Sequence, residues 1–379
     1  MARQPFLCRF VDNVQNIPAA DPLGDLLARR SLNVKNTVTD KIVLILTSKN
    51  DPEADLIGIA LRNRGIDYIR INGSDIPTHI SIRYLVEKDS GLLNFQLIVK
   101  KHVLDVSKIC LAWLRNFDLN QINFRGNKMV RTFSIQQWQD GFQILQNNLQ
   151  CSWINSPHAT IGANDHAKQL SVAKAIGFDV PATLITNDPA AAREFYYSYD
   201  GDILVKALHN HSVETQGKSY SMYSHKILEE DLSGLGDLVY APCIIQERLT
   251  KKSELRVTVV GDQVFAAELD CKSAPAACHD IHRSAAIGFP IRVFNMDDEF
   301  SSHCVKLVKS FGLKYGAIDF ILDKDDRRVF LEINPTGDWY WIERKLRLPI
   351  TRAMLEMIVA LSNFKLDESY LKGSYNRGQ

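Results

Sequence analysis

The sequence lacks a long apolar run, a paired-cysteine motif and an excess of one charge. No apolar stretch approaches membrane-spanning length, and the N-terminus has no signal-peptide core. Lys and Arg number 45 against 44 Asp and Glu, so no net field attracts nucleic acid or a membrane. The seven cysteines are an odd, scattered set without Cys-x-x-Cys, which favours reduced thiols over a disulfide frame or a zinc site. These absences predict a cytoplasmic protein without a nucleic-acid or membrane partner.

The length of 379 residues is sufficient for two or three lobes, each with its own core. A strand at Lys41 to Leu46, a helix at Pro52 to Arg64 and a strand at Asp67 to Ile71 predict a βαβ unit. Later segments are richer in strands, so the predicted class is α/β followed by α+β, in three lobes around a cleft. The expected divisions are an N-terminal extension, an N-terminal domain, a central subdomain and a C-terminal subdomain, at residues 1–40, 41–150, 151–250 and 251–379.

A carboxylate and a carboxamide stand two residues apart near the end of the chain. Glu332 and Asn334 occupy i and i+2 of a predicted strand, so both side chains point to one face. A preceding strand, Gly316 to Leu322, brings Asp319 opposite Glu332 if Lys324 to Arg327 form the loop of an antiparallel hairpin. Buried carboxylates without a cation are costly, and hard oxygen ligands suit Mg²⁺ that also carries phosphates. The hairpin therefore predicts a magnesium site.

Basic residues precede this hairpin in an order that suits a bound nucleotide. Lys206 lies inside an apolar strand, where a charge needs an anionic partner, and Lys168 lies on an earlier helix. Glu254 and Arg256 share a strand face, where a carboxylate can bind ribose hydroxyls and a guanidinium can hold phosphate. An ordinary cross-strand ion pair is the alternative for these two residues. Arg283 follows in a loop, and the chain has no P-loop motif.

Several stretches occur together that are typical of one family. They are Trp153-Ile154-Asn155, Lys168-Gln169-Leu170, Pro181 to Asn187, Ile245-Gln246-Glu247, Glu254 to Gly261 and Phe330 to Trp339. On these stretches, the segment from about Trp153 to Ile350 resembles the ATP-grasp superfamily. Within that superfamily it is similar to the ribosomal-peptide maturases that make graspetides such as microviridins. Residues 41 to 117 resemble the N-terminal lobe of these enzymes more loosely. The chain departs from the family pattern at Asn116, where Arg is usual, and at Thr336-Gly337-Asp338, where Asn-Gly-Gln is usual.

The resemblance implies ATP and Mg²⁺ as cofactors and assigns roles to individual residues. The ATP phosphates would be held by Lys168 and Lys206, adenine by Gln246, Glu247, Arg248 and Leu249, ribose by Glu254, the transferring phosphate by Arg256 and Arg283, and Mg²⁺ by Asp319, Glu332 and Asn334. His282 is a candidate base for a hydroxyl nucleophile, although a loop histidine is more often simply exposed. Arg115 could meet the substrate carboxylate, although an Arg at a strand end is more often a surface residue. The resemblance also suggests a homodimer.

A leader-like motif stands at the start of the chain. Related enzymes use a precursor leader with a short Pro-Phe-Phe-Ala-Arg-Phe-like motif, and this chain has Pro5-Phe6-Leu7-Cys8-Arg9-Phe10. If the segment is helical, Phe6, Arg9 and Phe10 share one face. Glu230 and Asp231, in a segment that resembles the leader-binding helix of the family, could pair with Arg9. We hypothesise that residues 1 to about 16 mimic a leader in cis or across a dimer; a plain amphipathic cap is the alternative.

Three functions are compatible with these patterns. The first is an ADP-forming ligase that activates Asp or Glu side chains of a ribosomal precursor peptide and links them to Ser, Thr or Lys, giving macrocyclic esters or amides. The second is a carboxylate–amine ligase for a small molecule or a peptide terminus. The third is an inactive nucleotide-binding adaptor. A complete set of predicted lysines, arginines and metal ligands favours an enzyme over the adaptor.

Overall fold

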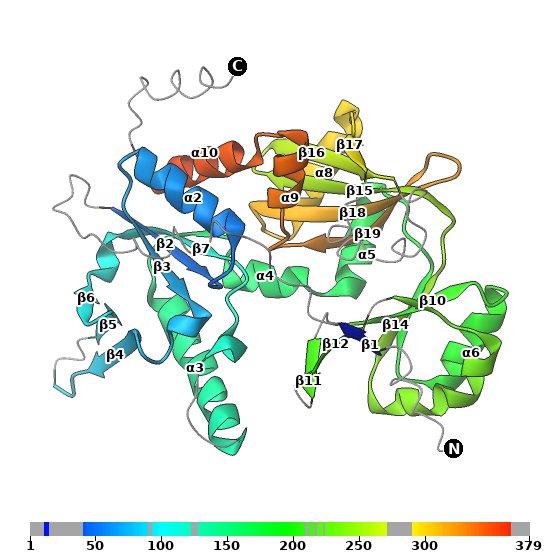
Figure 1. Ribbon diagram of the computed structural model, residues 1–379, viewed down its shortest axis with the longest axis horizontal. Helices are drawn as coiled ribbons and strands as arrows, with labels where there is room; N and C mark the ends of the chain where they lie inside the picture. The colour runs from blue at the N-terminus through cyan, green and yellow to red at the C-terminus, as the bar shows by residue number, and fades with distance from the viewer. Residues whose placement is uncertain are drawn as a thin grey trace.

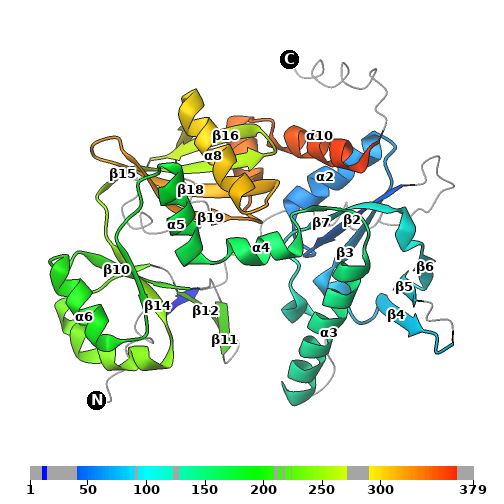
Figure 2. The ribbon, with the colours of Figure 1, turned by 180° about the vertical axis from the view of Figure 1, so that it is seen from behind.

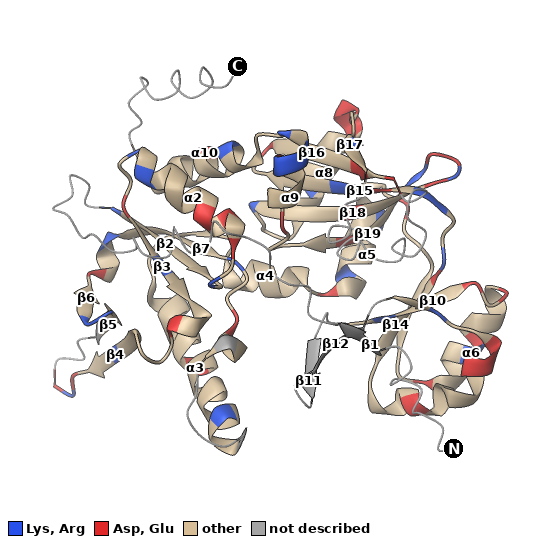
Figure 3. Cartoon of the chain, in the orientation of Figure 1, with Lys and Arg blue, Asp and Glu red and all other residues tan. Residues whose placement is uncertain are grey.

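A computed structural model describes residues 11–14, 41–89, 93–122, 128–208, 212–215, 218–222, 224–270 and 290–364. Phe6, Arg9, Phe10, His282 and Arg283 therefore lie outside the described residues. Within the part that is described, no helix is both long and apolar enough to cross a membrane. Basic and acidic residues are interspersed over the lobes in the view of Figure 3.

The first lobe is built on a parallel sheet of strand order β3-β2-β7-β8. The strands are β2 (Ile42–Thr47), β3 (Tyr68–Asn72), β7 (Ile109–Leu114) and β8 (Ser152–Ile154). Helix α2 (Pro52–Asn63) connects β2 to β3, so the predicted βαβ unit is confirmed. The helix begins at its Asp51 cap, which accepts a hydrogen bond from the Ala54 N–H. Strand β8 extends the first sheet with residues that follow the expected division after residue 150.

A smaller antiparallel sheet and a long helix complete this lobe. The sheet has the order β4-β5-β6, and helix α3 (Lys128–Asn148) extends away from the strands in Figures 1 and 2. The remaining elements are β4 (Ile80–Val86), β5 (Leu93–Val99), β6 (His102–Leu104) and the 3-10 helices η3 (Gly73–Asp75), η4 (Val106–Lys108) and η5 (Leu119–Gln121).

The central lobe contains a four-stranded sheet of order β13-β10-β14-β9. Its strands are β9 (Thr183–Thr186), β10 (Ile203–Ala207), β13 (His225–Lys226) and β14 (Cys243–Glu247). Helix α6 (Pro189–Ser198) and the 3-10 helix η6 (Glu229–Tyr240) pack against it through a small apolar core. Beside it, β11 (Ser212–Thr215) and β12 (Lys218–Met222) form a hairpin, and β1 (Val11–Val14) pairs antiparallel with β12. The N-terminal extension therefore contributes a strand to this lobe.

The C-terminal lobe is an antiparallel sheet of order β17-β16-β15-β18-β19. Its strands are β15 (Lys251–Val260), β16 (Gln263–Leu269), β17 (Ile291–Val293), β18 (Tyr315–Asp323) and β19 (Arg328–Asn334). One face packs on the helices α4 (Pro157–Ala163), α5 (His166–Ile176) and α8 (Asp298–Ser310) through a buried apolar cluster. Helices α4 and α5 fall within the expected central subdomain but pack on this C-terminal sheet.

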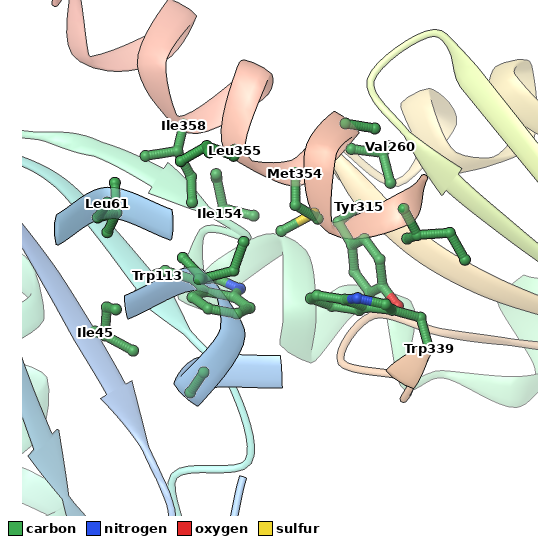
Figure 4. Close-up of a cluster of buried hydrophobic side chains, with 14 of the residues drawn as sticks. Ile45, Leu61, Trp113, Ile154, Val260, Tyr315, Trp339, Met354, Leu355 and Ile358 are labelled. Carbon is green, nitrogen blue, oxygen red and sulfur yellow. The ribbon is translucent and has the colours of Figure 1, made fainter. Parts of the chain in front are cut away.

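The first and C-terminal lobes share one hydrophobic core (Figure 4). Trp113 from β7 stacks on Trp339, which follows β19, with ring centroids 5.9 Å apart, and Tyr315 of β18 packs on Trp339 at 5.3 Å. Met354 enters this core from helix α10 (Ile350–Ser362) and is fully buried. Helix α9 (Tyr340–Leu346) is also involved. Because the cluster crosses both lobes, the loop after β19 is fixed against the first lobe.

We expect Met354→Ala to lower the free energy of unfolding by about 2–5 kcal/mol, because it removes a fully buried side chain and leaves a cavity. Met357 lies on the same helix and is only partly buried, so Met357→Ala is the matched control with a smaller loss. Chemical denaturation of the two variants measures both values. Equal losses would contradict the shared core.

Candidate active site

Three charged side chains stand side by side across neighbouring strands of the C-terminal sheet. Arg256 of β15 is in register with Asp319 of β18, and Asp319 is in register with Glu332 of β19. Asn334 lies two residues beyond Glu332 and therefore on the same face. Strand β18 ends at Asp323 and β19 begins at Arg328, so the predicted loop and the pairing of Asp319 with Glu332 are confirmed. The register expected to produce this pairing is wrong next to the loop, where Leu322 and not Asp323 lies opposite Arg328; one extra residue in β19 between Phe330 and Glu332 then brings Glu332 opposite Asp319.

The Arg256 guanidinium and the Asp319 carboxylate form a buried ion pair. Arg256 Nη1 donates to both carboxylate oxygens, at 2.9 and 2.8 Å, and both side chains are almost completely buried. Burial disfavours the charged guanidinium, but the charge of Asp319 and its hydrogen bonds outweigh this and raise the pKa of Arg256. Arg256 therefore stays cationic at the place where an anionic phosphate is expected.

The oxygen atoms on this face suit a hard cation. Asp319 and Glu332 supply carboxylates and Asn334 supplies a carboxamide, which is the donor set that Mg²⁺ takes in phosphate chemistry. The Asn334 carboxamide oxygen accepts hydrogen bonds from Thr336, at 2.9 Å from the backbone N–H and 3.3 Å from the hydroxyl. The loop that follows β19 thus fixes the orientation of a predicted metal ligand.

Two of the predicted nucleotide-binding residues meet in the central lobe. Lys206 Nζ of β10 donates to the side-chain oxygen of Gln246 on β14 at 2.7 Å, and the Gln246 amide donates to Thr183 at 2.9 Å. Strand β14 ends at Glu247, whose backbone N–H donates to the Ala182 carbonyl. Lys206 and Gln246 are thus brought together by neighbouring strands.

The next predicted residues occupy less buried positions at the end of β14. Arg248 is half-exposed and its Nε donates to Asp202 at 2.6 Å, while Leu249 directly follows and is half-buried. Glu254 lies on the same face of β15 as Arg256, is buried, and pairs with Lys251. Strand β15 therefore presents the predicted ribose and phosphate ligands together.

The remaining predicted residues lie elsewhere or have other partners. Lys168 is exposed on α5, and its ammonium group lies 5.5 Å from the ring centroid of Phe311. Arg115 is 1% exposed and is surrounded by protein oxygens, a geometry that favours a positioning role over an encounter with substrate. Asp231 is buried and accepts from the Leu228 N–H, so it caps η6, whereas Glu230 is exposed.

Gln169 is a site residue that the sequence-based roles missed. It is 2% exposed on α5, and its amide bonds the main chain of Ile333, which lies between Glu332 and Asn334. The nitrogen donates to the Ile333 carbonyl and the oxygen accepts from the Ile333 N–H, both at 3.0 Å; the nitrogen also donates to the Ala163 carbonyl at 2.6 Å. Its sequence position could have indicated that it is buried, because Gln169 lies four residues before Ala173 and therefore on the same, apolar face of the helix.

The C-terminal sheet thus carries Arg256, Asp319, Glu332 and Asn334 on one face, and the central lobe carries the Lys206–Gln246 pair. The sequence profile described as a RimK-like ATP-grasp domain matches residues 163–358, slightly more than half of the chain. The chain therefore belongs to the RimK-like ATP-grasp family. No curated protein sequence matches it.

Several solved structures share the fold over most of the chain. The macrocyclase MdnC of Microcystis aeruginosa MRC, bound with its precursor peptide MdnA, has a TM-score of 0.74 at 23% identity, covering 84% of this chain and 99% of MdnC. A RiPP-associated ATP-grasp ligase of Chryseobacterium gregarium, in complex with ADP and a leader and core peptide, has a TM-score of 0.75 at 22% identity, covering 85% and 97%. The macrocyclase MdnB of Microcystis aeruginosa MRC has a TM-score of 0.70 at 26% identity, covering 84% and 99%.

We expect Gln169→Met to weaken binding of Mg²⁺·ADP and to lower stability by about 1–3 kcal/mol, because it leaves buried backbone groups of β19 without partners. Calorimetric titration with Mg²⁺·ADP and thermal unfolding measure the two effects. Lys174→Met, on the exposed face of the same helix, is the matched control. An unchanged affinity in Gln169→Met would show that the amide does not position the metal ligands.

Proposed function

We propose that the protein activates Asp or Glu side chains of a ribosomal precursor peptide as acyl phosphates and closes ester or amide rings with Ser, Thr or Lys. The observation that carries the proposal is the row of Arg256, Asp319 and Glu332, with Asn334 beside it, on one face of the C-terminal sheet. The likeness to MdnC bound with its precursor peptide supports a peptide as the substrate. These side chains supply a phosphate ligand and metal ligands at one place.

The reaction accounts for its atoms and charges. The peptide carboxylate attacks the γ-phosphorus of ATP, the bond to the β-phosphate oxygen breaks, and ADP leaves. A hydroxyl or amine then attacks the acyl carbon, and inorganic phosphate leaves with one carboxylate oxygen. A hydroxyl proton departs with the phosphate, whereas an ammonium nucleophile also releases one further proton. Each ring therefore removes one water from the peptide.

Positioning and charge neutralisation are the contributions of the protein to this reaction. Mg²⁺, held by Asp319, Glu332 and Asn334, would neutralise the nucleotide phosphates. Arg256 stays cationic in its buried position and would hold the transferring phosphoryl group. Lys206 reaches from the central lobe, where its ammonium already has a hydrogen-bond acceptor in Gln246.

The remaining assignments are also proposals. Arg283 and His282, outside the described residues, stay predicted as a second phosphate ligand and a candidate base. Adenine contacts are proposed for Gln246, Glu247, Arg248 and Leu249, a ribose contact for Glu254, and a phosphate contact for Lys168. We also propose a homodimer in the cytoplasm. The free thiols of Cys110, Cys151, Cys243 and Cys304 support a reducing compartment.

The N-terminal segment is proposed to replace a leader. Strand β1 pairs with β12 from Val11 opposite Met222 to Val14 opposite Ser219, which anchors the residues directly after the leader-like motif on the central lobe. Backbone pairing of this kind is a general way to hold an extended peptide on a sheet edge. Glu230 is exposed at the start of η6 in the same lobe and could receive Arg9.

The first test is the intact mass of peptides that contain Asp or Glu together with Ser, Thr or Lys, after incubation with protein, Mg²⁺ and ATP. We expect a loss of one water per ring with stoichiometric ADP. Glu332→Gln should abolish the loss because it removes a metal ligand, whereas the exposed Glu299→Gln should not. Turnover of small carboxylates and amines alone would instead indicate a small-molecule ligase, and no ADP with any substrate would indicate the adaptor.

A deletion separates the leader hypothesis from the activity. Removal of residues 1–16 should abolish ring formation, and a synthetic peptide of residues 1–16 should restore it when added in trans. Removal of residues 1–4 alone keeps the motif and β1 and is the matched control. Charge reversal gives a second test: Glu230→Arg should reduce turnover, and Arg9→Glu in the same chain should recover it. Unchanged turnover after deletion of residues 1–16 would refute the mimic.

A further inference from the structure

Arg115, at the end of β7 in the first lobe, directs its whole guanidinium group into the protein. Its side chain is 1% exposed, and Nε lies 3.1 and 3.0 Å from the two carboxylate oxygens of Asp51. Nη2 lies 3.1 Å from Glu53 and also pairs with Asp338, while Nη1 donates to the carbonyls of Thr336 and Gly337 at 2.9 and 3.1 Å. Every nitrogen of the guanidinium thus has an oxygen partner.

The charges around Arg115 keep it ionised. Burial disfavours the cation, but Glu53, Asp51 and Asp338 outweigh burial and raise the pKa of Arg115. For Glu53, burial is the largest influence and raises the pKa of its carboxyl despite the nearby guanidinium. Arg115 also lies over the Trp339 ring, 4.9 Å from its centroid. The guanidinium is therefore held from both lobes by charge, hydrogen bonds and an aromatic face.

The acceptors on the far side belong to the loop that continues the metal-ligand strand. Thr336 fixes the Asn334 carboxamide through its backbone N–H and hydroxyl. The Gly337 carbonyl also accepts from the Tyr315 hydroxyl at 2.5 Å. Glu53 completes the attachment, because its second oxygen accepts from the N–H groups of Trp339 and Tyr340 at 2.9 and 3.0 Å. Arg115 and Glu53 of the first lobe thus contact each residue from 336 to 340 of this loop.

The same loop touches the ion pair of the active site. A Cβ atom at Gly337 would lie 2.7 Å from Arg256 Nη2 and 2.5 Å from the Ala317 Cβ, so only glycine permits this close approach. Arg256 in turn binds Asp319. A displacement of the loop would therefore move both the Asn334 carboxamide and the Arg256 guanidinium that binds Asp319.

We infer that Arg115 is a positioning residue that couples the first lobe to the metal site, so that affinity for the metal–nucleotide depends on a side chain that contacts neither. The inference rests on the metal site of the proposed function. It differs from the substrate-carboxylate role expected from the sequence. A lysine at position 115 cannot reproduce the contacts of the guanidinium, because an ammonium has only three N–H donors and these do not form a planar fork.

The test is the affinity of the full chain for Mg²⁺·ADP, measured by calorimetric titration, together with thermal unfolding. Arg115→Met and Arg115→Lys should each weaken binding about tenfold, which is about 1.4 kcal/mol. Arg70→Met is the matched control, because Arg70 makes several bonds but all within the first lobe, to Asp55, Asn72 and the carbonyls of residues 48 and 49. It should lower the unfolding midpoint without changing the affinity.

Asp338→Ala provides a second variant if Arg115→Met does not fold, since the Asp338 side chain is 52% exposed. It should weaken Mg²⁺·ADP binding, and its effect should be less than additive with that of Arg115→Lys because the two residues act through one contact. Unchanged affinity in folded Arg115 variants would overturn the inference while leaving the proposed function intact. Failure of the unmodified chain to bind Mg²⁺·ADP would overturn both.

Discussion

The structure depends on two guanidinium groups that remain charged while almost completely removed from water. Arg256 and Arg115 are each 1% exposed, and burial of an unpaired charge would cost several kcal/mol. The carboxylate of Asp319 neutralises the charge of Arg256. The charge of Arg115 is neutralised by the carboxylates of Asp51, Glu53 and Asp338. The pair of Arg256 and Asp319 lies within the C-terminal sheet, whereas Arg115 also contacts Asp338 and the carbonyls of Thr336 and Gly337, so Arg115 fixes the first lobe against the C-terminal lobe. The stacked pair of Trp113 and Trp339 closes the same junction with apolar surface.

Local patterns were sufficient to predict the hairpin of β18 and β19 and the pairing of Asp319 with Glu332. The polar turn gave the loop, and the two-residue spacing of Glu332 and Asn334 gave the shared face, because strand geometry repeats every two residues. The role of Arg115 could not be read in this way, since its acceptors in Thr336 and Gly337 are 221 and 222 residues away in sequence. The burial of Gln169 could have been predicted, because it is a polar residue on the apolar face of a helix. Its acceptor on β19 could not, because that contact depends on how the helix packs against the sheet.

Helices α6 and α8 are among those that the sequence did not predict, for a different reason. Helix α6 has a capping Asp188 followed by proline, yet its aromatic residues favour strands, so the local signals conflict. Helix α8 has a clear Asp297 cap, and its apolar face is identified only once the C-terminal sheet is known. The pairing of β1 with β12 is a third case, because a long separation in sequence gives no clue to the partner strand. The missed α6 thus reflects conflicting local signals, whereas the buried face of α8 and the partner of β1 depend on contacts between elements.

The central claim is that one face of the C-terminal sheet activates a carboxylate by phosphorylation. Its most direct test is a peptide substrate whose Asp and Glu side-chain carboxylates carry ¹⁸O, incubated with the protein, Mg²⁺ and ATP. The account predicts that one labelled oxygen per ring appears in inorganic phosphate, because the acyl carbon loses that oxygen with the leaving group. Ring formation with unlabelled phosphate, or with the label in AMP, would contradict it.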